Sequence, residues 1–215
     1  MQLFYSNIFV LPLPEGHRFP MRKYSLLYER VARSELALAG AISMPPAASA
    51  EEITRAHDAE YLRRVMLGKL TDKELRRIGF PWSLLLVQRS LQTVGGTIAA
   101  CRAALAEGVA INLAGGTHHA FADHGQGFCV FNDAVVAART VQAEGLARQV
   151  LVIDPDVHQG NGTAALTRDD PSIFSFSIQS MKSSAFLLAA ERCPVRRSAI
   201  SQRMQRTLLM AQIVV

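Results

Sequence analysis

Two adjacent histidines follow a glycine pair in the middle of the chain, in the run Gly115-Gly116-Thr117-His118-His119. An imidazole can act as a general base near neutral pH, but it needs a partner that holds its ring in one tautomer. Without such partners the two rings are ordinary surface histidines. A catalytic role for His118 or His119 therefore requires partner side chains elsewhere in the chain.

A second polar cluster supplies acids, because Asp154, Asp156 and His158 alternate directly after the apolar run 150–153. Side chains at a period of two point to the same side of an extended segment. Two carboxylates packed together with an imidazole repel each other and lose hydration unless a cation joins them. Asp and His ligands favour zinc or a similar transition metal. The plainer alternative is an acidic strand end followed by a helix N-cap.

The surrounding pattern predicts the elements that carry these clusters. Short apolar runs at 109–113, 150–153 and 173–178 read as strands, Ser83 caps a long helix to Glu107, and Asn132 caps a helix over 133–144. Strands that alternate with helices favour a three-layer α/β/α fold with a mainly parallel sheet. In such sheets ligands bind beyond the carboxyl ends of the strands, where both polar clusters stand.

The N-terminal third is expected to hold more of the same architecture. The pattern predicts a strand over 3–10, a helix over 21–39, a linker over 43–50, and a helix that runs to about Met66 from a capping box of Ser49 and Glu52.

The net charge of the chain is unevenly distributed. The 215 residues include 23 Lys+Arg and 18 Asp+Glu, giving net +5, with 49% hydrophobic residues, a balance typical of a globular domain. Residues 1–181 hold 17 basic and 17 acidic side chains, so the whole excess lies in 182–215. A nucleic-acid-binding body is not favoured, because that function needs a clustered positive face.

Cysteine usage and hydropathy point to a cytoplasmic protein. Cys101, Cys129 and Cys193 are far apart, so neither a disulfide framework nor a thiolate zinc site is indicated. The N-terminus lacks a basic region followed by a long apolar run, and no apolar run approaches the ~20 residues that span a bilayer. We expect no signal peptide and no membrane partner.

Taken together, the motifs resemble the histone deacetylase family, in its bacterial or class IV-like branch. The three main runs are Gly115-Gly116-Thr117-His118-His119-Ala120, Gly127-Phe128-Cys129-Val130-Phe131-Asn132-Asp133 and Asp154-x-Asp156-x-His158-Gln159-Gly160-Asn161-Gly162. The early runs Gly16-His17-Arg18-Phe19-Pro20-Met21, His57-Asp58-x-x-Tyr61-Leu62 and Gly79-Phe80-Pro81-Trp82 are also similar. The resemblance covers roughly residues 1–178. It implies the arginase/deacetylase fold, with 179–215 as a basic tail outside the family domain.

This resemblance implies zinc-dependent hydrolysis of an acylated amine, either an acetylated lysine or an acetylated small amine. Asp156 and His158 would bind zinc. His119 would be the general base, and His118, oriented by Asp154, would be its electrostatic or proton-handling partner.

Further residues take roles by the same resemblance. Asn161 stands where a residue orients His119, a position that holds Asp in some relatives. Phe128 would line the channel for the acyl group, and the carbonyl of Gly127 would face the amide of the substrate. Asp154 and Ser177 match a structural monovalent-cation site, for K⁺ in relatives.

The chain departs from the family pattern after residue 178. The family carries a third zinc ligand, an Asp, and a late Tyr that stabilises the oxyanion, yet here no Asp follows Asp170 and no Tyr follows Tyr61. We expect a frame change or a truncated gene model near Gln179, which sequencing the gene across that point tests. The rival hypothesis is that 198–215 forms a basic helix.

Three functions stay open on the sequence. The first is a zinc deacylase cut short, and the second is a catalytically incomplete fragment or pseudoenzyme that acts as a binding module. The missing Asp and Tyr separate these two. The third is a nucleic-acid binder that uses the basic tail, which lacks the interleaved aromatic residues that stack on bases. The oligomeric state is not indicated.

Overall fold

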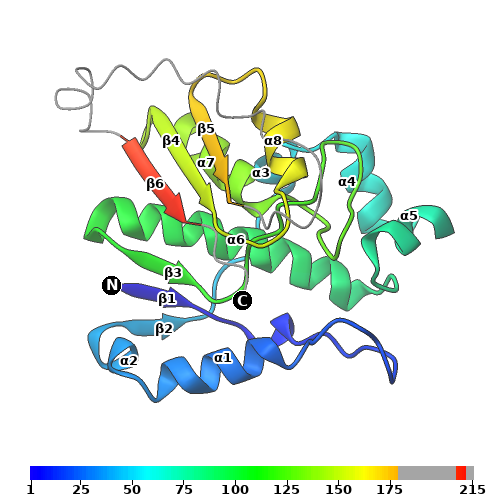
Figure 1. Ribbon diagram of the computed structural model, residues 1–215, viewed down its shortest axis with the longest axis horizontal. Helices are drawn as coiled ribbons and strands as arrows, with labels where there is room; N and C mark the ends of the chain where they lie inside the picture. The colour runs from blue at the N-terminus through cyan, green and yellow to red at the C-terminus, as the bar shows by residue number, and fades with distance from the viewer. Residues whose placement is uncertain (179–206, 212–215) are drawn as a thin grey trace.

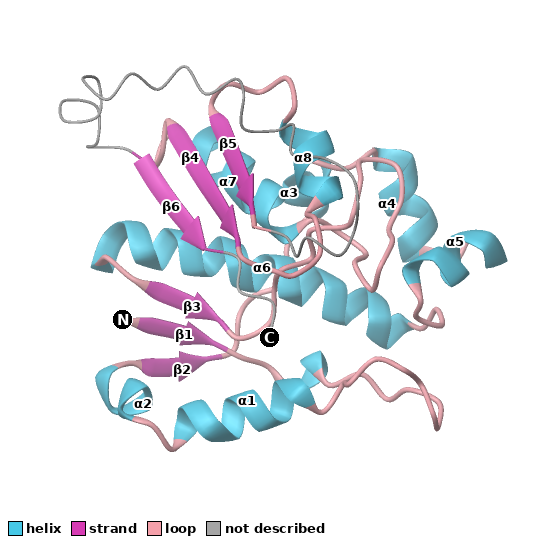
Figure 2. Ribbon diagram, in the orientation of Figure 1, coloured by secondary structure: helices cyan, strands magenta, loops and turns pink. Residues whose placement is uncertain are grey.

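The computed structural model describes residues 1–178 and 207–211 as an α/β arrangement of short strands and helices (Figure 1, Figure 2). In chain order its elements are β1 (Gln2–Phe4), the 3-10 helix η1 (Asn7–Phe9), α1 (Lys23–Ala32), α2 (Glu35–Ala39), β2 (Ala41–Ser43), α3 (Ala50–Thr54), α4 (Ala59–Met66), α5 (Asp72–Ile78), α6 (Leu84–Glu107), β3 (Ala110–Asn112), α7 (Asp133–Ala143), β4 (Gln149–Asp154), α8 (Asn161–Thr167), β5 (Ile173–Ser177) and β6 (Thr207–Ala211).

The strands pair in parallel, as the sequence predicts, but in two groups. The orders are β2-β1-β3 and β5-β4-β6, and no described strand bonds β3 to β6. In Figure 1 the arrows of β1, β2 and β3 point to the right and those of β4, β5 and β6 slope down to the right, so the carboxyl ends of β3, β4 and β5 turn toward the middle of the molecule. The parallel α/β class is confirmed, although one continuous sheet was expected.

The long helix α6 lies behind the strands and begins and ends where the sequence predicts. The Ser83 hydroxyl accepts the amide of Leu86 at 3.0 Å, and Gly108 ends the helix with φ +96°. A Cβ at Gly95 would lie 2.0 Å from the Pro46 carbonyl oxygen, and one at Gly96 would lie 2.7 Å from Asn112 Oδ1. The small residues therefore let α6 approach the 43–50 segment and β3 closely.

The second predicted cap is also confirmed. Asn132 is fully buried, and its side-chain oxygen accepts the amide of Val135 at 3.1 Å at the start of α7. The residues of α7 from Asp133 to Ala138 are all buried, so this helix forms part of the core behind β4.

Two predicted helices are interrupted. The helix expected over 21–39 breaks into α1 and α2, because the Ser34 hydroxyl and amide both donate to the Val31 carbonyl and end α1. The helix that starts at the confirmed capping box of Ser49 and Glu52 stops at Thr54, and α4 starts anew at Ala59.

The two ends of the chain also differ from expectation. The strand expected over 3–10 is only three residues long, because the Ser6 hydroxyl accepts the amide of Ile8 and caps η1. The rival hypothesis of a helix over 198–215 is wrong at 207–211, which form β6 beside β4. The rest of that segment and Cys193 lie outside the described residues.

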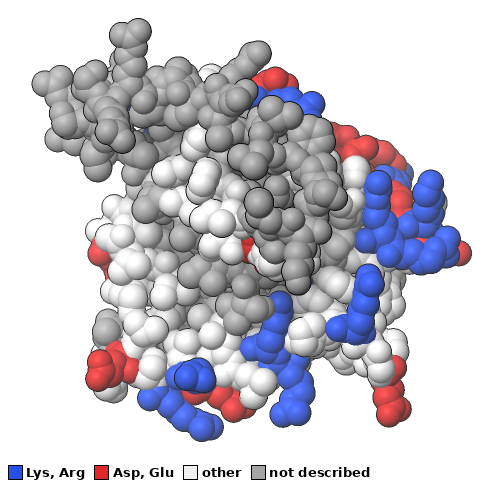
Figure 3. Space-filling view, viewed as in Figure 1, with Lys and Arg blue, Asp and Glu red and all other residues white. Residues whose placement is uncertain are grey.

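Surface charge on the visible face is mixed. Lys and Arg side chains gather over α4 and α5 (Figure 3), but acidic residues lie among them. Arg63 forms an ion pair with Glu60 at 2.7 Å, and Arg64 forms one with Glu74. Within residues 1–178 and 207–211, no helix is both long and apolar enough to cross a bilayer.

Candidate active site

The first histidine of the pair is buried beside a carboxylate. His118 is 3% exposed, and its Nδ1 donates to Asp154 Oδ2 at 2.6 Å. Asp154 is itself buried at the end of β4, where its other oxygen accepts the amide of Asp156 at 3.1 Å. A carboxylate held in this way fixes the His118 ring in the Nδ1–H tautomer.

The second histidine has an amide as its partner. His119 Nδ1 lies 2.8 Å from Oδ1 of Asn161, the first residue of α8. The amide N–H of Gly162 donates to the same oxygen at 3.0 Å, which fixes the orientation of the Asn161 side chain. Because this oxygen only accepts, Nδ1 of His119 carries the proton and Nε2 is left as the basic nitrogen.

Asp156 and His158 meet in a tight turn after β4 rather than on an extended strand. One oxygen of Asp156 accepts both the amide of His158 at 2.6 Å and its ring Nδ1 at 2.9 Å. This oxygen also lies 3.9 Å from His118 Nε2. The strand ends at Asp154, so the turn and not the pleat brings Asp156 and His158 together, while the Asp154 carboxylate pairs with His118 instead.

The rings of the cluster lie close to one another. The centroids of His118 and His119 are 4.1 Å apart, and those of His119 and His158 are 6.1 Å apart. Burial lowers the pKa of His119, and the neighbouring His118 and His158 lower it further, whereas the bond to Asn161 and the charge of Asp156 oppose the shift. His119 is therefore neutral at pH 7, as a general base must be.

Gly127 and Phe128 form the tip of a tight turn against His119. Gln126 and Cys129 exchange backbone bonds of 3.0 and 2.9 Å, and both central residues have positive φ, +56° and +65°. A Cβ at Gly127 would lie 2.8 Å from His119 Cδ2, so only glycine fits there. The thiol of Cys129 donates to the Gly127 carbonyl at 3.4 Å.

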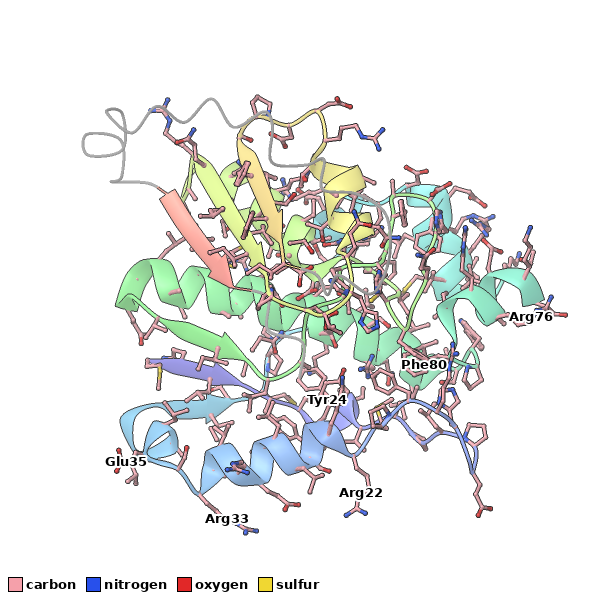
Figure 4. All side chains as sticks on the ribbon, in the orientation of Figure 1. Arg22, Tyr24, Arg33, Glu35, Arg76 and Phe80 are labelled. Atoms are coloured by element: carbon pink, nitrogen blue, oxygen red, sulfur yellow. The ribbon has the colours of Figure 1, made fainter. Side chains whose placement is uncertain are left out.

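Aromatic side chains surround Phe128. The ring centroids of Phe19 and Phe80 lie 4.8 and 5.1 Å from that of Phe128. Phe80 and Tyr24, both labelled in Figure 4, come from different segments, and the buried Arg89 guanidinium lies over both rings, 5.7 and 5.1 Å from their centroids. Phe128 therefore stands in an aromatic wall beside the histidine pair.

The monovalent-cation pair predicted from the resemblance is adjacent in the structure. Asp154 of β4 is in register with Ser177 of β5, and the Ser177 hydroxyl accepts the amide of Gly160 at 3.2 Å. A Cβ at Gly160 would lie 2.4 Å from Asp154 Oδ2. The K⁺ role of this pair stays a prediction.

Asp133 is an important residue that the sequence analysis did not single out. It is 1% exposed, and its carboxylate accepts the Thr97 hydroxyl at 2.6 Å and the Thr117 hydroxyl and amide at 2.5 and 2.8 Å. It thereby anchors the chain directly before His118. From the sequence it reads as an ordinary acid in the first turn of α7, and the only signal was its place in the family motif.

The donor set fits a metal only in part. Catalytic zinc sites have three protein ligands, and Asp156 and His158 supply two donors of the right chemistry. Within the described ranges, no three His, Cys, Asp or Glu side chains are grouped so that they could hold a metal ion.

Comparison with known proteins points to one family. Residues 17–192 match the family described as Histone deacetylase domain, so the predicted boundary at residue 178 stays a prediction. An uncharacterized protein of Picosynechococcus sp. is 45% identical over 81% of this chain and 58% of its own length. The acetoin utilization protein AcuC of Bacillus subtilis is 33% identical over 76% of this chain and 45% of its own length. The polyamine deacetylase HDAC10 of Rattus norvegicus is 32% identical over 60% and 24%, respectively.

A solved structure has the same fold. The crystal structure of the HDA15 HD domain superimposes with a TM-score of 0.71 over 88% of this chain and 56% of that chain, at 19% identity. The chain spans about half the length of the curated relatives that it matches.

Proposed function

The chain belongs to the histone deacetylase family, and on that premise we propose that it is a hydrolase that removes acyl groups from acylated amines. The substrate is an acetylated lysine or an acetylated small amine. The name of the rat relative, a polyamine deacetylase, supports the second class beside the first. One observation carries the proposal: two imidazoles, each with its own partner, stand beside Asp156 and His158 at the carboxyl ends of β3 and β4.

The roles of the side chains follow from their partners. His119 takes a proton at Nε2, because Nδ1 is held as a donor by Asn161. His118, held by Asp154, is the proton-handling partner of His119. Phe128 and the carbonyl of Gly127 align the acyl group and its amide beside His119.

Zinc would be held by Asp156 and His158, and the Asp that supplies the third ligand in the family has no counterpart after Asp170. When bound, it would polarise the acyl carbonyl and lower the pKa of a bound water. The free thiols of Cys101 and Cys129 support a reducing, cytoplasmic location.

A second candidate is a binding module without turnover. The two-donor set at Asp156 and His158 favours it, since a catalytic site needs a third ligand. Such a module would keep the aromatic wall around Phe128 and bind acylated amines without cleaving them.

The test measures zinc content and turnover of the purified full chain, with an acetyl-lysine peptide and with an N-acetylated diamine. The deacylase predicts stoichiometric zinc and a kcat that falls at least ~100-fold in His119→Ala. His124→Ala is the control, because this ring pairs with Asp123 at the surface of the same loop. Zinc-loaded protein that binds the peptide without turnover would reject the hydrolase in favour of the binding module.

A further inference from the structure

His57 is a buried histidine to which the proposed reaction gives no role. It follows α3, is 3% exposed, and uses both ring nitrogens. Its Nδ1 lies 2.8 Å from the carbonyl oxygen of Phe121, and its Nε2 accepts the amide of Asn132 at 2.8 Å. Because a carbonyl only accepts and an amide only donates, the ring is neutral and protonated on Nδ1.

These two bonds join distant parts of the chain. Phe121 is the second residue after His119, and Asn132 is the N-cap of α7. The His57 ring therefore links residue 121, just after the histidine pair, to the start of α7. The first residue of α7, Asp133, in turn binds Thr117, just before the pair.

Other hydrogen bonds hold further backbone carbonyls of the segment 118–122. The Thr163 amide donates to the His118 carbonyl at 3.0 Å, and the Asn132 side chain donates to the Ala120 carbonyl at 3.3 Å. The Asp58 amide donates to the Ala122 carbonyl at 2.9 Å. His57 closes this series at Phe121 and, like Thr163, also bonds Asn132 at the α7 cap.

We propose that His57 is a positioning residue, whose ring clamps residues 120–122 to the N-terminus of α7 and thereby fixes where the His118–His119 pair lies. The catalytic consequence rests on the proposed hydrolase function, but the clamp itself does not. Burial lowers the pKa of His57 to about 4, and the Arg139 guanidinium contributes to this shift, so the clamp is intact at neutral pH. Protonation would remove the acceptor for Asn132.

The chain offers graded variants for a test. His57→Asn places a side-chain amide where Nδ1 lies and keeps the donor to Phe121, but it loses the acceptor for Asn132. His57→Leu loses both. Ile98→Val, in the buried part of α6, lowers global stability without touching the clamp and serves as the control.

Hydrogen exchange followed by mass spectrometry on the full chain measures the clamp directly. At pH 7, exchange in peptides that cover 116–124 and 132 should rise about tenfold in His57→Leu and less in His57→Asn, with no comparable rise over 84–107. In Ile98→Val, exchange in the peptides that cover 116–124 should rise no more than exchange elsewhere in the chain. Equal exchange in the loop of His57→Leu and wild type, or a rise by the same factor everywhere, would overturn the proposal. If His57→Leu does not fold, His57→Asn decides by the same criterion.

Two further readouts separate positioning from plain stability. After correction for intrinsic exchange, loop exchange in the wild type should increase between pH 6.5 and 4.5, and this increase should be absent in His57→Asn. In the turnover assay His57→Asn should lower kcat with KM unchanged. If the wild type shows no turnover, the proposed hydrolase function is wrong. The exchange experiment still tests the clamp, because it does not depend on activity.

Discussion

Asn161 Oδ1 lies 2.8 Å from His119 Nδ1, and the amide of Gly162 binds the same oxygen at 3.0 Å. The backbone amide of Gly162 thus holds the Asn161 oxygen in the orientation that faces the histidine. The result is a neutral partner that fixes the His119 tautomer without adding a charge. The pKa of His119 consequently stays below its ordinary value, because burial and two neighbouring imidazoles are not opposed by a carboxylate at Nδ1.

Asn161→Asp should raise the pKa of His119. A carboxylate at Nδ1 favours the imidazolium and is expected to raise the pKa by about one unit or more. An NMR titration of the His119 ring measures this directly, and the acid limb of any turnover should move to higher pH by the same amount. Asn161→Leu is the control that removes the bond without adding charge. A His119 pKa that is equal in Asn161→Asp and the wild type would contradict the role given to Asn161.

The stability of the fold should fall as the pH drops through the range of His57. Its pKa is lowered to about 4 by burial, against 6.5 in the unfolded chain. The neutral ring therefore contributes fully above pH 6.5, and its contribution is lost as the pH falls toward 4. Between pH 7 and 5 the loss corresponds to ~2 kcal/mol of the free energy of unfolding. Urea unfolding at both pH values measures it. In His57→Asn the part of the loss that is due to His57 should disappear, and a wild-type curve that is flat over this range would show that the ring titrates normally.

Gly127→Ala should disturb His119 beyond the cost of the backbone. The residue has φ +56°, and an added Cβ would meet His119 Cδ2 at 2.8 Å. Gly145→Ala is a matched control, since Gly145 has φ +70° with nothing within 4 Å of an added Cβ. We expect Gly145→Ala to cost about 1 kcal/mol and Gly127→Ala to cost 1–3 kcal/mol more, roughly, with a shift of the His119 ring signals. Equal unfolding free energies for the two variants would disprove the close contact.

Asp133→Ala should destabilise the fold strongly. The buried carboxylate accepts bonds from Thr97 and Thr117, and its loss leaves these donors without an acceptor in the interior. The expected loss is ~3 kcal/mol of unfolding free energy, measured by urea denaturation. Asp72→Ala is the control, because Asp72 is also the first residue of a helix but is exposed, so only ~0.5 kcal/mol from the helix dipole is at stake. Similar losses in both variants would refute the anchoring role of Asp133.

Local signals made part of the fold predictable. Ser83, Asn132 and the pair Ser49 and Glu52 cap helices through bonds that span three residues, so a short window of sequence contains all the information. The break after Ala32 is also local, because Ser34 bonds back to Val31, whereas the break after Thr54 was not predictable in this way. At the second break, His57 and Asp58 are drawn to carbonyls of residues 121 and 122, and such distant partners leave no periodicity in the sequence.

The sequence by itself determined the residue types of the site, the family that they resemble, and the placement of both clusters after strands. The tertiary structure decided which side chains pair. Asp154 reaches His118 across 36 positions, Asn161 reaches His119 across 42, and His57 reaches Asn132 across 75. The physical reason is that a donor and an acceptor recognise each other only once packing has brought them within about 3 Å, out of water. The same packing turned Asp133, an ordinary first-turn acid by sequence, into the anchor of the histidine segment.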